Sequence, residues 1–253
     1  MGTSDNSRRS FLKKAALGTI AAISLPGIVS AAVPKFKTRH ITLQKGATIL
    51  FQGDSITDSG RNRDDTGYNT SKNLGSGYAM LAAASLLEKQ ADMQLKIFNK
   101  GVSGNKVYQL VDRWDNDCIA IKPDVLSILI GVNDLWHKLN GQYNGTVEIY
   151  KKDYIAMLEM TKRLLPDVKL IIGEPFGVRG IKAVNDNWYP EFLDYQKAAR
   201  DIAGQFGAAF IPYQAIFDEA QKYAPGSYWT GDGVHPTLAG AQLMAQAWLS
   251  VVR

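Results

Sequence analysis

From residue 34 onward, the chain alternates short apolar, β-rich runs with longer stretches of helical periodicity. Strands are predicted at residues 48–51, 95–98, 125–130, 169–172 and 208–211. Helices are predicted at about residues 76–90, 105–119, 146–165, 190–206 and 236–252. The run VLSILI at 125–130 is apolar throughout, which is typical of a strand covered on both faces. The repeated strand and helix predict an α/β fold with a five-stranded parallel sheet sandwiched by helices.

The first residues of the chain have the pattern of an export signal. An arginine pair at 8–9 is followed by an uncharged run over 15–29 and by small residues at the expected cleavage point. This predicts a cleavable, twin-arginine-like signal over residues 1–31. The alternative is a retained anchoring helix, but the run is short for a membrane span and contains Pro26. Residues 32–253 are predicted to form one domain without a membrane span, in the periplasm or outside the cell.

Composition and charge limit the classes of protein to which this chain can belong. The chain is 45% apolar and 21% charged, as in ordinary globular proteins. Of the formal net charge of +5, residues 1–31 carry +3, so we expect no nucleic-acid partner for the rest. The single cysteine, Cys118, excludes an internal disulfide, and we interpret it as a small core residue. Three scattered histidines do not indicate a metal site, and we expect neither a metal nor a cofactor.

Three motifs follow the predicted strands at the edge of the sheet where ligands usually bind. Residues 53–55, Gly-Asp-Ser, come after the first strand and present a serine hydroxyl. Residues 99–105 follow the second strand, and residues 131–134, Gly-Val-Asn-Asp, follow the third. Glycine N–H groups and an asparagine amide are suited to hold a developing oxyanion. Each motif alone is also ordinary turn chemistry, so the inference depends on their meeting at one edge.

A fourth motif, with Asp232 and His235 three residues apart, precedes the last predicted helix. In a turn, this spacing lets the carboxylate contact one imidazole nitrogen and leaves the other free to take a proton from serine. The alternative is a surface histidine beside a helix-capping aspartate. His137 lacks such an upstream carboxylate and His40 lies near the predicted mature N-terminus, so neither is expected to be the base.

Taken together, the four motifs resemble the sequence blocks of the SGNH, or GDSL, esterase and lipase superfamily. They comprise residues 53–55, Gly104, residues 131–134 and residues 232–235. The resemblance extends over nearly the whole chain after the predicted signal, from about residue 45 to 250. It implies a flavodoxin-like, three-layer α/β/α sandwich that hydrolyses esters without a cofactor.

The resemblance also assigns roles to individual residues. It implies that Ser55 is the nucleophile, His235 the base and Asp232 the partner that orients the imidazole. The oxyanion hole would consist of the N–H groups of Ser55 and Gly104 and the side chain of Asn133. Within this superfamily, longer stretches around the first three motifs resemble the bacterial acetylxylan esterase branch. That branch carries tryptophan directly before the aspartate, where this chain has glycine, so the sugar-binding pocket is expected to differ.

Five residues are candidates for contact with a sugar. Trp136, Trp188 and Trp229 fall in predicted loops at the edge of the sheet, where an aromatic face could cover a pyranose. The alternative is that these rings pack beneath long loops. Asp54 and Arg61 lie beside the serine, and Arg61 could meet an acidic sugar substituent or simply be solvated.

The leading hypothesis is an exported serine esterase that removes O-acetyl groups from plant-type polysaccharide or oligosaccharide such as xylan. A lipase or thioesterase acting on longer acyl chains would use the same catalytic residues. A catalytically silent carbohydrate-binding protein is the alternative from another class. The sequence leaves homo-oligomer formation open.

Overall fold

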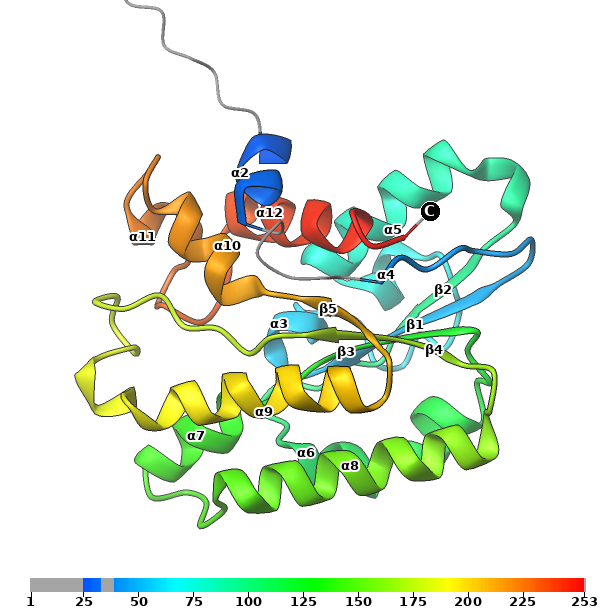
Figure 1. Cartoon of the computed structure of the whole chain (residues 1–253). Helices are drawn as coiled ribbons and strands as arrows, with labels where there is room; N and C mark the ends of the chain where they lie inside the picture. Colours follow the sequence, from blue (N-terminus) through cyan, green and yellow to red (C-terminus); the bar gives the residue numbers. More distant parts are fainter. Residues whose placement is uncertain (1–24, 33–38, 253) are drawn as a thin grey trace, which may run out of the picture.

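The computed structural model describes residues 25–32 and 39–252, which contain a five-stranded parallel sheet (Figure 1). Its strands are β1 (Thr48–Gly53), β2 (Lys96–Asn99), β3 (Val125–Leu129), β4 (Lys169–Gly173) and β5 (Ala209–Ile211). The order across the sheet is β2-β1-β3-β4-β5, which is that of flavodoxin-like doubly wound folds. The predicted parallel sheet is confirmed, and its strand boundaries differ from the predictions by one or two residues.

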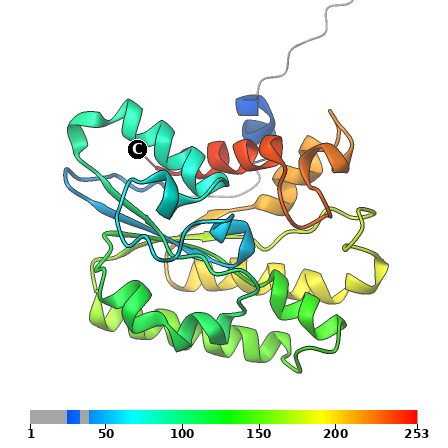
Figure 2. The same cartoon turned by 180° about the vertical axis from the view of Figure 1, so that it is seen from behind.

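Helices cover both faces of the sheet (Figures 1 and 2). One layer contains α2 (Leu25–Ala32), α5 (Tyr78–Lys89), α10 (Tyr213–Ala220) and α12 (Leu238–Leu249). The other contains α6 (Val107–Asp112), α8 (Val147–Leu164) and α9 (Glu191–Gln205). The remaining α-helices of the described residues are α3 (Ser55–Asp58), α4 (Ser71–Leu74), α7 (Val132–Leu139) and α11 (Gly226–Trp229). The predicted three-layer sandwich is therefore confirmed.

One predicted helix is not continuous. The sequence predicts a helix over 105–119, but α6 ends at Asp112 and a π-helical turn follows at Asp115–Ile119. The interruption falls at Arg113, whose guanidinium turns inward and donates hydrogen bonds to the side chains of Gln52 on β1 and Asp117. Hydrophobic periodicity gives no sign of this partly buried polar contact, so it predicts one continuous helix.

The core explains why the sheet forms where it does. All five residues of β3 are buried, as expected for a strand between two helical layers. Phe51 on β1 packs against Trp248 of α12, with ring centroids 4.9 Å apart. The indole N–H of Trp248 donates to the Ser127 hydroxyl at 3.0 Å, so its one polar atom is paired inside the core. Cys118 is fully buried, which confirms its interpretation as a core residue.

The strand order determines where a site can lie. β1 pairs with β2 on one side and with β3 on the other, so the chain changes direction across the sheet between these strands. Such a switch point leaves a crevice at the carboxyl ends of the strands. Gly53 at the end of β1 lies opposite Leu129 at the end of β3. The segments that follow these two residues therefore emerge side by side.

The predicted export signal lies mostly outside the described residues, which begin at Leu25. Helix α2 extends across the predicted cleavage point after Ala31 and packs against α10 and α12. Its Ile28 and Val29 side chains are buried there. Within residues 25–32 and 39–252, no helix is both long and apolar enough to cross a membrane.

Candidate active site

A tight turn after β1 places Ser55 at the first position of α3. Gly53 has a φ of +155°, and a Cβ on it would lie 2.3 Å from the Leu129 carbonyl oxygen, so a larger residue does not fit. Asp54 caps the helix, because its carboxylate accepts a hydrogen bond from the Ile56 N–H at 3.0 Å. The half-buried Ser55 side chain is thereby held at the carboxyl edge of the sheet.

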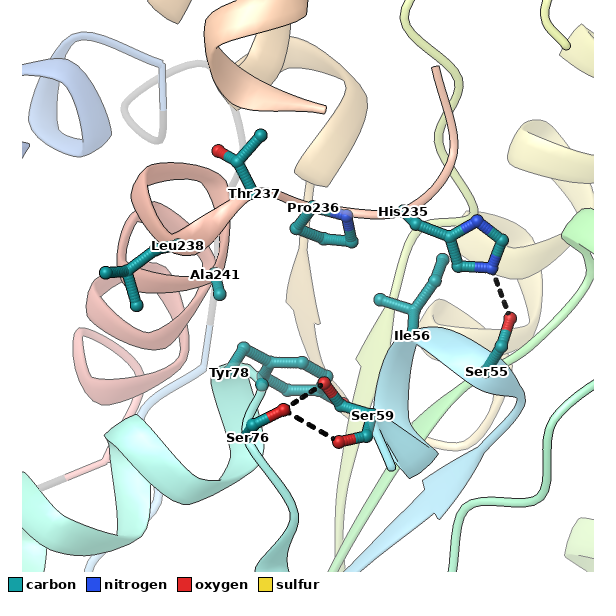
Figure 3. A pocket seen from close by; sticks show the side chains of 11 residues that line it. Ser55, Ile56, Ser59, Ser76, Tyr78, His235, Pro236, Thr237, Leu238 and Ala241 are labelled. Atoms are coloured by element: carbon teal, nitrogen blue, oxygen red, sulfur yellow. Dashed lines mark hydrogen bonds between the residues drawn. The ribbon is translucent and has the colours of Figure 1, made fainter. Parts of the chain in front are cut away.

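Ser55, His235 and Asp232 form a continuous hydrogen-bonded chain, although Ser55 and His235 are 180 residues apart in the sequence. The Ser55 Oγ and the His235 Nε2 are hydrogen-bonded (Figure 3), and they lie 2.8 Å apart. The His235 Nδ1 lies 2.7 Å from the Asp232 Oδ2. An ionised carboxylate only accepts hydrogen bonds, so Nδ1 carries the proton and Nε2 is left to accept the serine hydroxyl.

Asp232 is held in its ionised form. Partial burial acts to raise its pKa, but three hydrogen bonds outweigh that effect and lower the pKa below its usual range. They come from the main-chain N–H groups of His235 and Val234, at 2.7 and 2.9 Å, and from the His235 ring. The geometry therefore supplies the charged partner that a protonated imidazole requires.

The loop that carries Asp232 and His235 is fixed to the segment after β4. The Val178 N–H donates to the Gly233 carbonyl at 2.8 Å, and the Ala183 N–H donates to the Asp232 carbonyl at 2.9 Å. Gly233 has a φ of +97°, and a Cβ there would meet the Val178 carbonyl oxygen at 2.8 Å. Glycine is therefore required for this close approach.

Asn133 and Gly104 lie on two neighbouring segments at the same edge. Asn133 is in the first turn of α7, 3% exposed, and its Nδ2 donates to the Asn105 carbonyl at 3.2 Å. This hydrogen bond brings the amide to the loop that contains Gly104, whose φ is +82°. An amide nitrogen has two protons, so Asn133 retains one donor for a ligand.

The loop over residues 99–105 is braced by hydrogen bonds from three charged side chains, of which two are buried and one is partly buried. The Asp58 carboxylate accepts from the Ser103 N–H at 2.9 Å, and the Arg61 Nε donates to the Gly101 carbonyl at 2.7 Å. Arg113 donates to the Lys100 carbonyl at 2.8 Å. These partners are 45, 40 and 13 residues apart, so no local pattern in the sequence could have indicated them.

A second histidine lies close to Gly104 but is paired differently. The Lys106 Nζ lies 3.0 Å from the His137 Nδ1 and 5.6 and 5.4 Å from the ring centroids of Tyr108 and Tyr143, which stack on each other. An ammonium group only donates, so the His137 Nδ1 accepts and its Nε2 carries the proton. Burial, and then the charge of Lys106, lower the pKa of His137. The hydrogen-bond partner of the His137 Nδ1 is therefore a lysine, whereas that of the His235 Nδ1 is a carboxylate.

Two buried carboxyl groups lie behind the site. Burial is the main cause that raises the pKa of Asp54 and of Asp134 to about 7 each. Asp134 accepts from the Val107 N–H at 3.2 Å, and one oxygen of each carboxyl lacks a hydrogen-bond partner. Both groups are therefore easily protonated near neutral pH, unlike Asp232.

The prediction that Asp54 and Arg61 contact the substrate is wrong. Asp54 is completely buried and serves as a helix cap. Arg61 is only 8% exposed, and its guanidinium holds the Gly101 carbonyl instead of meeting solvent or a sugar. Both residues position the chain around Ser55.

The three candidate tryptophans differ in their exposure to solvent. Trp188 and Trp229 are 2% and 3% exposed, so the prediction of sugar contact is wrong for them. Trp188 lies in a 3₁₀ turn at Asp186–Trp188 and packs against Trp136, whereas the Trp229 indole donates to the Ala220 carbonyl at 3.1 Å. Trp136, on α7, remains half-buried with its ring 6.1 Å from that of His235.

Metal-ligating side chains do not gather in the described part of the chain: no three histidine, cysteine, aspartate or glutamate residues come together there. The chemistry that the described site offers is a serine hydroxyl, an imidazole that can accept its proton, an ionised carboxylate and neighbouring N–H donors. This is the set of groups used for acyl transfer through a serine.

Known proteins share this architecture. Residues 51–243 match the model of the GDSL-like lipase/acylhydrolase family. An acetylxylan esterase from Geobacillus stearothermophilus is 34% identical over 206 residues, which cover 81% of this chain and 93% of that protein. A crystal structure from Parabacteroides merdae, assigned as a GDSL-like lipase, has a TM-score of 0.82 at 51% identity and covers 84% of this chain and 98% of its own.

A solved acetyl-xylooligosaccharide esterase from Geobacillus stearothermophilus, an arginine-to-alanine variant, has a TM-score of 0.75 at 32% identity. The match covers 83% of this chain and 95% of that one. Catalytic mutants of that enzyme replace a serine, a histidine and an aspartate by alanine. Its aspartate and histidine are three residues apart, the same spacing as Asp232 and His235. The present chain thus belongs to the GDSL-like lipase/acylhydrolase family and is a serine carboxylic ester hydrolase.

Proposed function

We propose that Ser55 is the nucleophile of this esterase, with His235 as its general base and Asp232 as the group that orients the imidazole. The observation that carries the proposal is the unbroken hydrogen-bonded chain from the Ser55 Oγ to the Asp232 carboxylate, at 2.8 and 2.7 Å. A serine hydroxyl is a weak nucleophile until a base accepts its proton. The 2.8 Å contact between the Ser55 Oγ and the His235 Nε2 supports this role for His235.

The reaction would proceed in two halves. The Ser55 Oγ attacks the ester carbonyl carbon while its proton moves to His235, and a tetrahedral intermediate forms. His235 then gives that proton to the leaving alcohol as the C–O bond breaks, which leaves an acyl group on Ser55. Water, activated by His235, repeats the sequence and releases the acid.

The oxyanion of each intermediate would be held by the N–H groups of Ser55 and Gly104 and by the Asn133 amide. This role is supported by the position of Asn133 beside the 99–105 loop and by its spare amide proton. The buried or partly buried hydrogen bonds of Asp58, Arg61 and Arg113 support a loop that is held in place before substrate arrives. Donors fixed in advance need no reorganisation during the reaction.

We propose acetylated carbohydrate, such as acetylated xylan or its oligosaccharides, as the substrate. The support comes from the matches to Geobacillus stearothermophilus, which are named for acetylxylan and acetyl-xylooligosaccharide. Trp136, beside His235, is the one candidate tryptophan with an exposed surface near the reacting groups.

We further propose that residues 1–31 direct export and are removed, which leaves residues 32–253 as a single domain in the periplasm or outside the cell. The support is the sequence pattern alone. Mass spectrometry of the protein recovered from a cell envelope fraction tests this: a start at Ala32 agrees with the proposal, and an intact α2 contradicts it.

The substrate proposal is tested by acetate release from acetylated xylooligosaccharides, together with a series of p-nitrophenyl esters. We expect acetate to be released and p-nitrophenyl acetate to be hydrolysed at least about tenfold faster than the octanoate, since a site for acetyl groups excludes long chains. Faster octanoate hydrolysis without acetate release would instead favour the lipase hypothesis. Carbohydrate binding without reaction of Ser55 with a fluorophosphonate would favour the silent binding protein.

A further inference from the structure

A cavity of about 320 Å³ opens next to Ser55, between α3, the start of α5 and the start of α12 (Figure 3). Ser55 and His235 lie at one end of it and Leu238 lies at the other. We propose that this cavity binds the sugar that carries the ester, with Ser59 and Ser76 contacting two neighbouring hydroxyl groups. The inference rests on the proposed function, because it says where the alcohol part of the proposed substrate, the sugar, binds.

The position of the cavity relative to His235 assigns it to the alcohol. In acyl transfer through a serine, the imidazole that takes the serine proton must deliver it to the leaving oxygen. The leaving group therefore lies on the histidine side of the nucleophile, away from the oxyanion donors. His235 and Ser55 line this cavity, whereas Gly104 and Asn133 do not.

The two serines provide complementary hydrogen-bonding groups. The Ser76 Oγ donates its only proton to the Ser59 carbonyl at 2.9 Å, so it can only accept from a ligand. The Ser59 Oγ lies 3.4 Å from the Ser76 Oγ, a long contact that leaves its proton available to a better acceptor. Adjacent sugar hydroxyls can each donate and accept, so a vicinal diol would satisfy both groups.

Local structure keeps these hydroxyls in the cavity. Gly77 follows Ser76, and a Cβ at Gly77 would lie 2.7 Å from the Ser59 Oγ. Any larger residue there would displace the Ser59 side chain. The nearby Thr237 hydroxyl is unavailable, because it donates to the Tyr228 carbonyl at 2.6 Å and points away from the cavity (Figure 3).

Apolar residues line much of the rest of the cavity wall. Ile56, Tyr78 and Ala241 line it with at most 5% of their surface exposed, and Leu238 lies at the far end with 76% of its surface exposed. Contact of an apolar leucine side chain with water is unfavourable, so a ligand that covers Leu238 gains binding free energy through the hydrophobic effect. A sugar ring has hydroxyls at its edge and C–H groups on its faces, so it matches a wall with both kinds of group.

The test compares two substrates with the same acyl group: acetylated xylooligosaccharides and p-nitrophenyl acetate. For the Ser59→Ala/Ser76→Ala double variant, we expect the ratio of kcat/KM for the oligosaccharide to kcat/KM for the aryl ester to fall by about tenfold, through a higher KM. Leu238→Ala should lower the same ratio by roughly threefold. The matched controls, Ser71→Ala and Leu193→Ala, replace exposed residues outside the cavity and should leave the ratio unchanged.

Three results would overturn the inference. An unchanged ratio in the double variant would show that the serines do not contact the sugar. Equal losses on both substrates would show an effect on Ser55 itself. A selective change in octanoate hydrolysis would place the acyl chain in the cavity. If the wild-type enzyme releases no acetate from the oligosaccharides, the proposed function fails as well, which distinguishes that outcome from the other three.

Discussion

The two sides of Ser55 differ in how firmly their residues are held. On the oxyanion side, formed by Gly104, Asn133 and the 99–105 loop, Asn133 is 3% exposed and bonded to the main chain. On the pocket side, formed by the cavity with Ser59, Ser76 and Leu238, the residue Ser76 is exposed and Leu238 is 76% exposed. The oxyanion side is fixed by contacts within the protein, whereas the pocket side has exposed surface that a ligand can contact.

The difference follows from what each side must do. An oxyanion forms at the same position whatever the alcohol, so donors fixed by buried hydrogen bonds stabilise it without reorganisation. The alcohol differs from substrate to substrate, and a polar, partly exposed wall can exchange its contacts with water for contacts with a sugar at small cost. Changes on the oxyanion side should therefore alter turnover on every ester, and changes on the pocket side should alter the choice of ester.

The largest effect in this comparison is expected for Asp232→Asn. The amide oxygen can keep the hydrogen bonds from the Val234 and His235 N–H groups, but the amide nitrogen would donate to the His235 Nδ1. That forces the proton onto Nε2, the wrong tautomer for a base. From the effect of the same change in a serine protease, kcat should fall by about 10⁴-fold on sugar and aryl esters alike. A loss below about tenfold, with Asp201→Asn as the control, would contradict the role of Asp232.

A smaller loss is expected for Asn133→Ala on the oxyanion side. Removing one oxyanion donor costs about 10²–10³-fold in kcat. The loss should be the same for acetylated xylooligosaccharides and p-nitrophenyl acetate, because both form the same oxyanion. Steady-state kinetics of this variant and of Asn140→Ala, an exposed position at the end of α7, provide the measurement. A loss confined to the sugar substrate would show that Asn133 contacts the sugar and not the oxyanion, which contradicts the difference between the two sides.

The smallest effect concerns stability, and its dependence on pH, at Asp54, which caps α3 and adjoins Ser55. Burial raises the pKa of Asp54 from 3.8 to about 7, so between these pH values the folded protein binds a proton that the unfolded chain does not. Stability should thus decrease as pH rises from about 4 to about 7. Asp54→Asn keeps an oxygen for the Ile56 N–H and cannot ionise, so it removes this contribution.

Thermal unfolding of the Asp54→Asn variant and the wild type at pH 5 and pH 8 measures the effect. The Tm of the variant relative to the wild type should be higher at pH 8 than at pH 5, by a few degrees. Any constant cost of placing an amide in the site cancels in this difference. Parallel pH profiles for the two proteins would mean that Asp54 is not held neutral by burial.

The fold was predictable because it depends on patterns that recur locally. Apolar runs such as 125–130 indicate strands, and the parallel arrangement then places the loops after β1 and β3 at one edge. This was sufficient to bring Ser55 and Asn133 to the same region. The short helix α7 was not predicted. It has only eight residues and directly follows a glycine-containing turn, so its sequence is equally compatible with a loop.

What could not be predicted is which polar residues turn inward. Arg61 and Asp54 read as surface residues beside the nucleophile, and only contacts such as that of Arg61 with Gly101, 40 residues away, reveal a buried role. The burial of Trp188 and Trp229 likewise depends on how the loops fold over them. The meeting of Ser59 and Ser76 arises from two turns 17 residues apart and leaves no signal in the sequence.

The central claim is that His235 activates Ser55, and covalent labelling tests it most directly. Intact-protein and peptide mass spectrometry after brief treatment with a fluorophosphonate should show one adduct, on Ser55, in the wild type. Ser55→Ala should show none, and His235→Ala should label at least about a hundredfold more slowly. An adduct on another residue, or full esterase activity in Ser55→Ala, would contradict the account.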